Sequence, residues 1–593
     1  MAPMSRRQAL IETAVVFAVF FLQGAWPVPD VNEPYYLGKA IHFWNPAWAA
    51  GDAFLQSADS HRVFYWTLGW MSLVLGPTAL AWTLRTITWA LLAWAWRRLS
   101  VALVPRPWFA PLTATIFLFL VQHYAVAGEW VVGGAEAKGF AYVLVLLGLE
   151  ALVRGQWNRT WLYLGAASAM HVLVGGWSAL AAGIAWMVCR WEATGWRTVF
   201  RRTPINGGQG TMQHGRPLNS NAQACPLNVP SLRSMAAAIA GGLLLAALGL
   251  IPAIALDWHA DRAEVGQAHE IYVFLRFPHH LDPFRFPAQK VVLFLLLAAE
   301  WLLLAVVWLL LAGRRRGETT SSGAKPQAAS GAFTWFVHAT LLVAVAGLGL
   351  RVLGEFDRGL AAGLLRFYWF RLADVAVPLG VTFLGVALVA QGDRLSASRF
   401  RHGCLAAMIL LAVLHVADCV VLRLFAAPPF DERVPDLHAW GSALAWLGGR
   451  GEGPIFPRQP RADRMPGFPA WKEACTWIAE SGRIPAGARF LTPRMSQTFK
   501  WYAHRAEVAT WKEAPQDAAE LVRWWDRIED LYATGREPPE PQYHASLAEL
   551  GAERLRQLAG RYDAQYVITE ATEPPVGLPI VFQNRAYVVY RLQ

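Results

Sequence analysis

Long apolar stretches dominate this sequence, and they constrain its fold more than any other feature. A bilayer core of about 30 Å requires roughly 20 apolar residues per helix, because no water is present there to satisfy backbone N–H and C=O groups. Residues 236–256 (AAAIAGGLLLAALGLIPAIAL) readily meet this requirement. We therefore predict an α-helical polytopic membrane protein with about eleven transmembrane helices. The predicted spans are residues 9–26, 80–96, 108–125, 139–153, 160–174, 177–191, 236–256, 290–312, 334–350, 375–391 and 404–424.

The composition agrees with this fold class. Hydrophobic residues make up 55% of the chain, charged residues only 16%, and the 30 tryptophans suit aromatic belts at two membrane faces. The formal net charge of +11 is then mostly a consequence of topology, so we expect no nucleic-acid partner. The five cysteines form neither a disulfide framework nor a metal-binding motif.

Basic residues cluster at one set of span ends, and short cytoplasmic loops retain Lys and Arg. This pattern predicts a cytoplasmic N-terminus and an extracytoplasmic segment after about residue 427, in a bacterial plasma (inner) membrane. The Gly/Ser/Asn/Pro-rich segments 203–232 and 313–331 are predicted to be cytoplasmic loops. The basic clusters are Arg6/Arg7, Arg97/Arg98, Arg154/Arg159, Arg197/Arg201/Arg202, Arg314/Arg315/Arg316 and Arg394/Arg399/Arg401.

The chain after the membrane pattern changes in character. We predict a multi-pass domain over residues 1–426, a linker over 427–469 and a soluble α/β extracytoplasmic domain over 470–593. Amphipathic helices are expected at WKEACTWIAE, QDAAELVRWWDRIEDLY and SLAELGAERLRQLAGRY, and strands at ARFLTP, QYVITE, PIVFQ and AYVVYRL.

The candidate chemistry lies in the predicted outer loops, which are residues 27–79, 123–138, 257–289 and 351–374. Asp30 and Glu33 directly follow the first span, where a general base would meet a lipid-borne substrate. Asp52 is a further acidic residue of this loop. The alternative is that Asp30 and Glu33 only cap and solvate a helix end.

Other outer loops combine cations with aromatic residues. Lys138 is a candidate for contact with a phosphate, although a surface pair with Glu136 is an equal alternative. Arg276, His279 and His280 lie in HEIYVFLRFPHHLDPFRF and are candidates for phosphate or sugar contact, with metal binding and loop packing as alternatives.

Arg366 and Arg371 flank the aromatic run FYWF before the tenth span. Positive residues are normally sparse on this side of the membrane. Because arginine pairs with phosphate bidentately and aromatic residues can hold a prenyl chain, we predict a lipid-phosphate contact here. Structural pairing of these arginines with Glu355, Asp357 or Asp374 is the alternative.

Three pieces of the sequence together resemble the GT-C superfamily of membrane glycosyltransferases. They are DVNEPYYLGKA after the first span, similar to the Asp-Glu-x-x-Tyr of protein mannosyltransferase and aminoarabinose transferase relatives, the following VFYWTLGW, and LRTITWALLAWAWRRL, in which Arg85 opens the next span. The resemblance implies a GT-C-like fold and a base or coordinating carboxylate in the first outer loop, which falls on Glu33 or Asp30. It also implies a late-span cation on the carrier phosphate, which falls on Arg366 or Arg371. Asn32 stands where the relatives carry the Asp of the Asp-Glu pair.

We therefore expect an inverting hexosyl or pentosyl transferase of the cell envelope. It would take its sugar from a polyprenyl-phosphate carrier in the membrane lipid and pass it to a glycan, lipid or protein hydroxyl. No cofactor is required by this scheme, and a divalent cation beside Asp30 and Glu33 stays open. One rival is a transporter or flippase for a lipid-linked substrate, which would use the same arginines but no base. The other is a non-catalytic protein of envelope assembly, consistent with Asn32.

Overall fold

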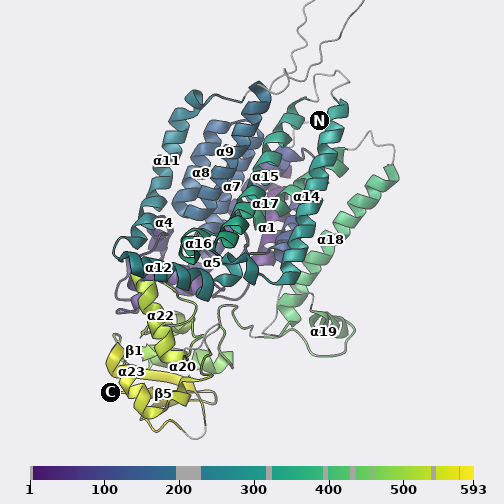
Figure 1. Ribbon diagram of the computed structural model, residues 1–593. Helices are drawn as coiled ribbons and strands as arrows, with labels where there is room; N and C mark the ends of the chain where they lie inside the picture. The colour runs from purple at the N-terminus through teal and green to yellow at the C-terminus, as the bar shows by residue number, and fades with distance from the viewer. Residues whose placement is uncertain are drawn as a thin grey trace, which may run out of the picture.

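The computed structural model describes residues 5–194, 229–315, 324–391, 398–427, 436–456, 458–535, 542–572 and 575–593. A bundle of long helices forms the upper part of the molecule in Figure 1, and a smaller domain with a β-sheet lies below it. The predicted fold class, a polytopic helical domain followed by an α/β domain, is confirmed. Most of the predicted loop 203–232 lies outside the described residues. Of the predicted loop 313–331 only residues 316–323 do, and its two ends belong to helices α14 (Ala288–Arg315) and α15 (Ala324–Leu353) instead.

Each of the eleven predicted spans overlaps a helix, although 160–174 runs across the break at His171 between two helices. Among the described residues, seven helices are long and apolar enough to cross a membrane, namely α1, α9, α11, α14, α15, α17 and α18. The chain is therefore a membrane protein. The long helices are α1 (Arg6–Gly24), α5 (Pro77–Leu103), α6 (Phe109–Tyr124), α7 (Ala137–Val153), α8 (Trp157–Met170), α9 (Val172–Thr194), α11 (Leu232–Ile254), α14 (Ala288–Arg315), α15 (Ala324–Leu353), α17 (Arg371–Gln391) and α18 (Ser398–Phe425).

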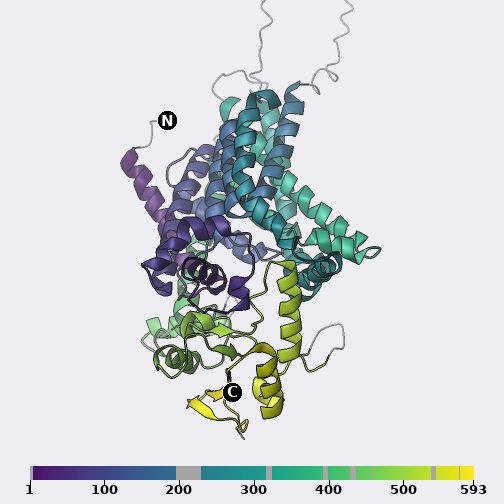
Figure 2. The same cartoon turned by 90° about the vertical axis from the view of Figure 1, so that its left-hand side faces the viewer.

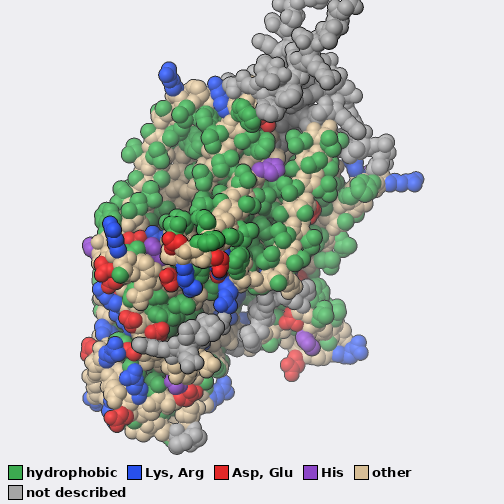
Figure 3. All heavy atoms as spheres, viewed as in Figure 1, with side chains coloured by type: hydrophobic (Ala, Val, Ile, Leu, Met, Phe, Trp, Pro, Cys, Tyr) green, Lys and Arg blue, Asp and Glu red, His purple; other side chains and the backbone are tan. Residues whose placement is uncertain are grey.

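Side-chain chemistry divides the surface along the long axis of the molecule. Hydrophobic side chains dominate the helical bundle in Figure 3, whereas charged side chains gather at its lower end and on the small domain, and a few Lys or Arg side chains lie at its upper edge. A helix surface without charge is stable only against lipid or protein. The predominantly hydrophobic band therefore marks the part of the bundle that lies in the bilayer.

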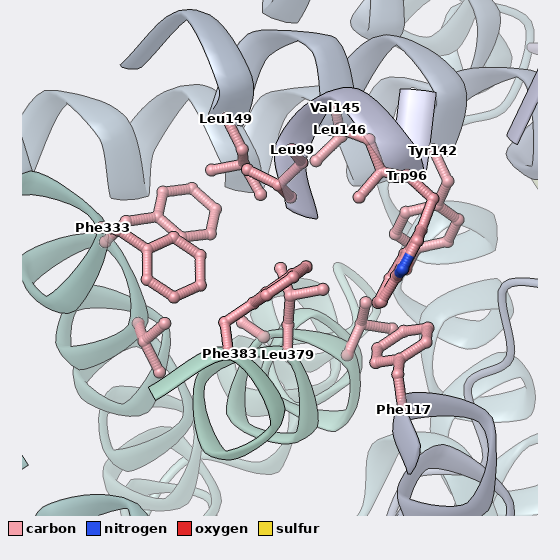
Figure 4. Packing of buried hydrophobic residues seen from close by; sticks show 14 of the residues in the cluster. Trp96, Leu99, Phe117, Tyr142, Val145, Leu146, Leu149, Phe333, Leu379 and Phe383 are labelled. Atoms are coloured by element: carbon pink, nitrogen blue, oxygen red, sulfur yellow. The ribbon is translucent and has the colours of Figure 1, made fainter. Parts of the chain in front are cut away.

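Small residues and aromatic rings pack the bundle. A Cβ on Gly165 of α8 would lie 2.1 Å from the carbonyl oxygen of Gly242 in α11, so these two backbones touch directly. Such close approach is typical of membrane helices, which associate through van der Waals packing rather than the hydrophobic effect. Deeper in the bundle, the Trp96 ring lies against Phe117 and Phe383, with ring centroids 4.7 Å and 5.2 Å apart (Figure 4).

Short helices line the lower end of the bundle, where the predicted outer loops lie. The turn η3 is a π-helical turn. Among these helices, α4, α12 and α16 are labelled in Figure 1 at the level where the small domain begins. The short helices are α2 (Glu33–Trp44), α3 (Ala53–Gln56), α4 (Arg62–Leu68), η1 (Gly69–Leu73), η2 (Ala255–Asp257), α12 (Arg262–Glu270), η3 (Ile271–Arg276), α13 (Pro278–Leu281), η4 (Pro283–Arg285) and α16 (Arg358–Leu365).

The C-terminal domain is a five-stranded sheet covered by helices on both faces. The strand order is β2-β1-β3-β5-β4, in which β1 pairs in parallel with β2 and β3, and β5 pairs antiparallel with β3 and β4. Successive residues of a strand face opposite sides, so Phe490 packs with α20 and Leu491 packs with α22 and α23. The elements are α20 (Phe468–Glu480), β1 (Arg489–Leu491), α21 (Phe499–Ala503), β2 (Ala506–Glu507), α22 (Ala518–Tyr532), η5 (Leu547–Leu550), α23 (Gly551–Tyr562), β3 (Tyr566–Glu570), β4 (Ile580–Gln583) and β5 (Tyr587–Arg591).

All three helices and all four strands predicted for this domain are present, and β2 is an additional strand. It escaped prediction because two residues are too few to form an alternating pattern. The predicted linker over 427–469 contains a helix of its own, α19 (Leu437–Leu447). Asp436 caps this helix by accepting hydrogen bonds from the N–H groups of His438 and Ala439.

A buried ionic cluster joins the C-terminal domain to the first outer loop. The Lys500 Nζ lies 3.2 Å from Asp52 Oδ2 of the loop, 2.8 Å from Glu507 Oε1, and in contact with Glu513 Oε2. Figure 2 shows the dark purple helices of this loop directly above the yellow-green C-terminal domain. We call Lys500, Asp52, Glu507 and Glu513 the interdomain clamp. Asp52, predicted as an acidic residue near the substrate, belongs to this clamp.

The interdomain clamp predicts that stability depends on pH. Burial and the nearby carboxylates raise the pKa of Glu513 to about 8, although the charge of Lys500 acts in the opposite direction. Between its ordinary pKa of 4.5 and about 8, the folded state binds a proton that the unfolded state has released, so stability falls as pH rises through this range. We expect a lower thermal midpoint at pH 8.5 than at pH 6, and a smaller difference in Glu513→Gln. An unchanged pH slope in this variant would contradict the prediction.

Candidate functional site

A cavity of about 840 Å³ lies where the helical bundle meets the C-terminal domain. One part of its wall is apolar and comes from α6, through Phe117, Leu118 and Val121. The remaining wall is rich in ionisable side chains. These are Asp30, Glu129, Glu136, His279, His280, Lys290, Arg461, Asp463, Arg464 and Lys512.

Asp30 lines this cavity, as its position after the first span led us to expect. The Arg461 guanidinium of the linker binds it bidentately, with Nε 2.8 Å from Oδ1 and Nη2 2.7 Å from Oδ2. Burial alone would raise the pKa of Asp30, but the charges of Arg461 and Arg85 outweigh it and hold this pKa below its usual value. Asp30 is therefore an ionised carboxylate at neutral pH.

Glu33, the other predicted catalytic carboxylate, does not line the cavity. Its side chain is fully buried, and both carboxylate oxygens lie 2.6 Å from the Arg85 guanidinium of α5. It also accepts the backbone N–H groups of Asp30 at 2.7 Å and Ala135 at 2.8 Å. With its oxygens saturated and no access to the cavity, Glu33 holds two loops together, and we withdraw the base role expected for it.

A glycine in the second outer loop makes this arrangement possible. A Cβ on Gly134 would lie 2.8 Å from the Cβ of Asp30 and 3.1 Å from Cγ and Oε1 of Glu33. Backbone contact this close leaves no room for a side chain. We expect Gly134→Ala to lower stability by about 1–3 kcal/mol and to displace Asp30. A thermal unfolding midpoint equal to that of Gly266→Ala, where the added Cβ meets open space, would contradict this.

The second outer loop contributes Glu129 and Glu136 to the cavity wall, and Lys138, which does not line the cavity, pairs with both. Lys138 Nζ lies 3.1 Å from Glu129 Oε1 and 3.6 Å from Glu136 Oε2, and 3.3 Å from the centre of the Trp130 ring. Asn32 Nδ2 donates to Glu136 Oε1 at 3.2 Å. Burial raises the pKa of Glu136, and the opposing charge of Lys138 only partly offsets it. Glu136 is therefore a buried carboxyl that can exchange a proton with a ligand.

The histidine pair forms another part of the wall. His279 and His280 both line the cavity, and their ring centroids lie 4.0 Å apart. His280 Nδ1 lies 2.6 Å from the Ala127 carbonyl oxygen. Burial, followed by the charge of Arg371, keeps the pKa of His280 well below its usual value, so this ring is neutral.

The predicted arginines occupy positions outside the cavity wall. Arg371 Nε lies 3.3 Å from Glu129 Oε2, so it acts behind a lining carboxylate. Arg366 pairs with Asp257 at 2.8 Å and also contacts His269. The phosphate role expected for Arg366 is therefore revised, because its guanidinium is engaged in an ion pair away from the cavity.

Arg276 is likewise engaged elsewhere. Its Nε donates to the Trp511 carbonyl oxygen at 2.9 Å, and its guanidinium lies over the rings of Phe277 and Trp511. It therefore helps to fix the C-terminal domain on η3. It does not line the cavity.

The two predicted carboxylates do not fit a divalent cation. A metal site needs free carboxylate oxygens directed at one point. Those of Asp30 are taken by Arg461, and those of Glu33 by Arg85. Among the described residues, no group of three or more His, Cys, Asp or Glu side chains could hold a metal ion.

Seven ionisable lining residues were absent from the predicted site, namely Glu129, Glu136, Lys290, Arg461, Asp463, Arg464 and Lys512. Glu136 had a visible signal, since it is an acidic residue between glycines in an outer loop. Asp463, Arg461, Arg464 and Lys512 had none, because they lie in the linker and the C-terminal domain, far along the chain from the first outer loop. Burial raises the pKa of Asp463 to about 7, despite a hydrogen bond from the Met465 N–H.

A domain of unknown function (DUF6798) matches residues 469–531. No curated protein matches the chain. Similar solved structures include the Archaeoglobus fulgidus oligosaccharyltransferase in the apo form, with 10% identity and a TM-score of 0.36, covering 95% of this chain and 69% of that one.

Two further structures of the same kind are similar. One is the Archaeoglobus fulgidus oligosaccharyltransferase tethered to an acceptor peptide containing the NVT sequon, with 11% identity, a TM-score of 0.35 and coverage of 95% and 69%. The other is AglB from the same organism with an inhibitory peptide and a dolichol-phosphate, with 12% identity, a TM-score of 0.37 and coverage of 94% and 69%. Scores in this range assign neither a family nor an activity to the present chain.

Proposed function

We propose that this protein is a membrane glycosyltransferase of the GT-C type, which transfers a sugar from a polyprenyl-phosphate carrier to an acceptor hydroxyl. The single observation that carries this proposal is the cavity between the two domains. It combines an apolar wall from α6 with a wall of carboxylates and cations. A lipid-linked sugar phosphate has the same two parts.

The two walls suit the two ends of such a substrate. The prenyl chain would lie along Phe117, Leu118 and Val121, and the phosphate and sugar would lie toward the C-terminal domain. A water-soluble nucleotide sugar has no apolar chain that would contact the apolar wall. This supports a lipid-linked donor.

Glu136 is the general base in this proposal. It takes the proton of the acceptor hydroxyl while the hydroxyl oxygen bonds to the anomeric carbon. The bond from that carbon to the phosphate oxygen breaks, and its electron pair leaves with the polyprenyl phosphate, so the anomeric configuration is inverted. A raised pKa makes Glu136 a stronger base than an ordinary carboxylate, and Asn32 orients it through its amide N–H.

Asp30 has a supporting role in the same scheme. It lines the cavity in a bidentate ion pair with Arg461, and this fixed pair holds the linker against the sugar site. Glu33 then supports Asp30 from behind, by accepting its backbone N–H. These two residues form one unit, of which only Asp30 faces the substrate.

The proposed location is the bacterial plasma membrane, with the N-terminus in the cytoplasm and the C-terminal domain outside. The arginine clusters at one set of span ends support this orientation. The acceptor would then be a glycan, lipid or protein of the cell envelope. A hexose or a pentose would fit the same chemistry.

The test uses purified protein in liposomes with a panel of polyprenyl-phosphate sugars and extracted envelope acceptors, and it follows release of the carrier phosphate. We expect turnover with at least one lipid-linked donor, and none with the same sugar 1-phosphate without its prenyl chain or with its nucleotide sugar. Turnover of a nucleotide sugar would refute the lipid-linked donor. Tight binding of a lipid-linked sugar without transfer to any acceptor would favour a transporter.

A further inference from the structure

Two cations of the cavity wall, Lys512 and Arg464, are not engaged by the described side chains around them. Of the other lining cations, Arg461 pairs with Asp30 and Lys290 donates to the His123 carbonyl oxygen. In contrast, within the described parts of the chain, no hydrogen bond or ion pair joins the Lys512 ammonium or the Arg464 guanidinium to another side chain. Both side chains are therefore available to an anion that enters the cavity.

The surroundings of Lys512 make an anion favourable there. Arg276, Arg464 and Lys138 repel its charge, and Glu136 is the nearby group that attracts it. Burial, followed by the charge of Arg276, lowers the pKa of Lys512 to about 7. An anion in the cavity would reverse this balance, because opposite charges at short range favour the protonated amine.

The backbone around Lys512 is fixed on both sides. The preceding residue, Trp511, donates its N–H to the Arg494 carbonyl oxygen and accepts from Arg276, both at 2.9 Å. The following residue, Glu513, belongs to the interdomain clamp through Lys500. Lys512 is thus held in position before any ligand arrives, which reduces the entropy lost on binding.

We propose that Lys512 and Arg464 bind the phosphate of the carrier lipid, so that the linker and the C-terminal domain complete the donor site. This inference rests on the proposed function and assigns the phosphate contact to residues outside the membrane domain. It replaces Arg366 and Arg276 in that role. Docking of the C-terminal domain then becomes a condition for donor binding.

The test measures binding of undecaprenyl phosphate, which carries no sugar, to the full chain in nanodiscs. We expect Lys512→Gln and Arg464→Gln each to weaken binding by about tenfold or more, because each removes a charged hydrogen bond. Arg483→Gln removes an exposed cation of the same domain outside the cavity and should bind as wild type. Binding of undecaprenol, which lacks the phosphate, should be equal in all variants.

A second measurement uses pH and the conservative variant. Wild-type binding should weaken as pH rises through about 7, because Lys512 loses its proton there. Lys512→Arg should bind undecaprenyl phosphate more tightly than Lys512→Gln does. Its binding should also lack this part of the pH dependence, since arginine stays charged. The titration of the phosphate itself is common to both proteins and cancels in the comparison.

Each outcome decides between the two proposals. Equal affinity of wild type, Lys512→Gln and Arg464→Gln for undecaprenyl phosphate would overturn the phosphate assignment, even if glycosyl transfer is observed. Weaker binding in both variants without transfer from any donor would support the phosphate site and refute the transferase. Competition by millimolar inorganic phosphate with no preference for the lipid would show a free-phosphate site and overturn the carrier assignment.

Discussion

Glu136→Gln is expected to lower the rate of sugar transfer by about 10²–10⁴-fold while leaving donor binding intact. The substitution keeps the shape of the side chain and its acceptor oxygen for Asn32, but it removes the group that takes the proton. Release of carrier phosphate at saturating donor measures the effect. Glu355→Gln makes the same chemical change on a carboxylate that is 61% exposed, and it should transfer at the wild-type rate.

Two further variants test whether Glu136 itself is the base. Asn32→Asp places a second carboxylate beside Glu136, which should raise the pKa of Glu136 further and move the rise of activity to higher pH. Asp463→Asn removes the other cavity carboxyl with a raised pKa. Loss of transfer in Asp463→Asn with full activity in Glu136→Gln would move the base role to Asp463.

Arg85→Met is expected to have the largest effect on stability. Arg85 and Glu33 are both fully buried, and removing the guanidinium leaves an unpaired carboxylate in the protein interior. Breaking a buried pair in this way costs about 3–5 kcal/mol. The Trp26 carbonyl oxygen would also lose its donor, now at 2.5 Å. We expect a marked fall in the thermal unfolding midpoint and in the yield of folded protein.

The double variant Arg85→Met/Glu33→Gln separates charge from packing. A neutral amide at position 33 can still accept the backbone N–H of Ala135, so the double variant should recover part of the lost stability. Arg523→Met breaks a helix-surface pair with Glu520 and should change stability by about 1 kcal/mol or less. If Arg85→Met were no more harmful than Arg523→Met, the buried pair would not be the structural link we infer.

Local patterns predicted the elements of this protein well. The eleven apolar stretches all overlap helices, and the strands β1, β3, β4 and β5 fall within the predicted runs. Both follow from short-range properties, namely hydrophobic length in the first case and period-two alternation in the second. The helix α19 lay in a stretch that we had assigned to a linker.

The candidate site was predicted only in part, because sequence position does not tell which way a carboxylate faces. Asp30 and Glu33 are three residues apart and looked equivalent. In the structure, Asp30 faces the cavity and Arg461, whereas Glu33 faces Arg85 and the protein interior. Arg85 and the acidic residues were parts of one sequence pattern, but their pairing depends on how α5 packs against the first outer loop.

The sequence by itself determined that this chain is a helical membrane protein with a soluble α/β domain, since apolar length and periodicity act locally along the chain. The tertiary structure decided which charges meet. It brought Arg461, Arg464 and Lys512 to the cavity that Asp30 lines, and it paired Arg366 with Asp257 outside this cavity. The physical reason is that the energy of a buried charge depends on partners from distant segments, which only the packing of whole domains brings together.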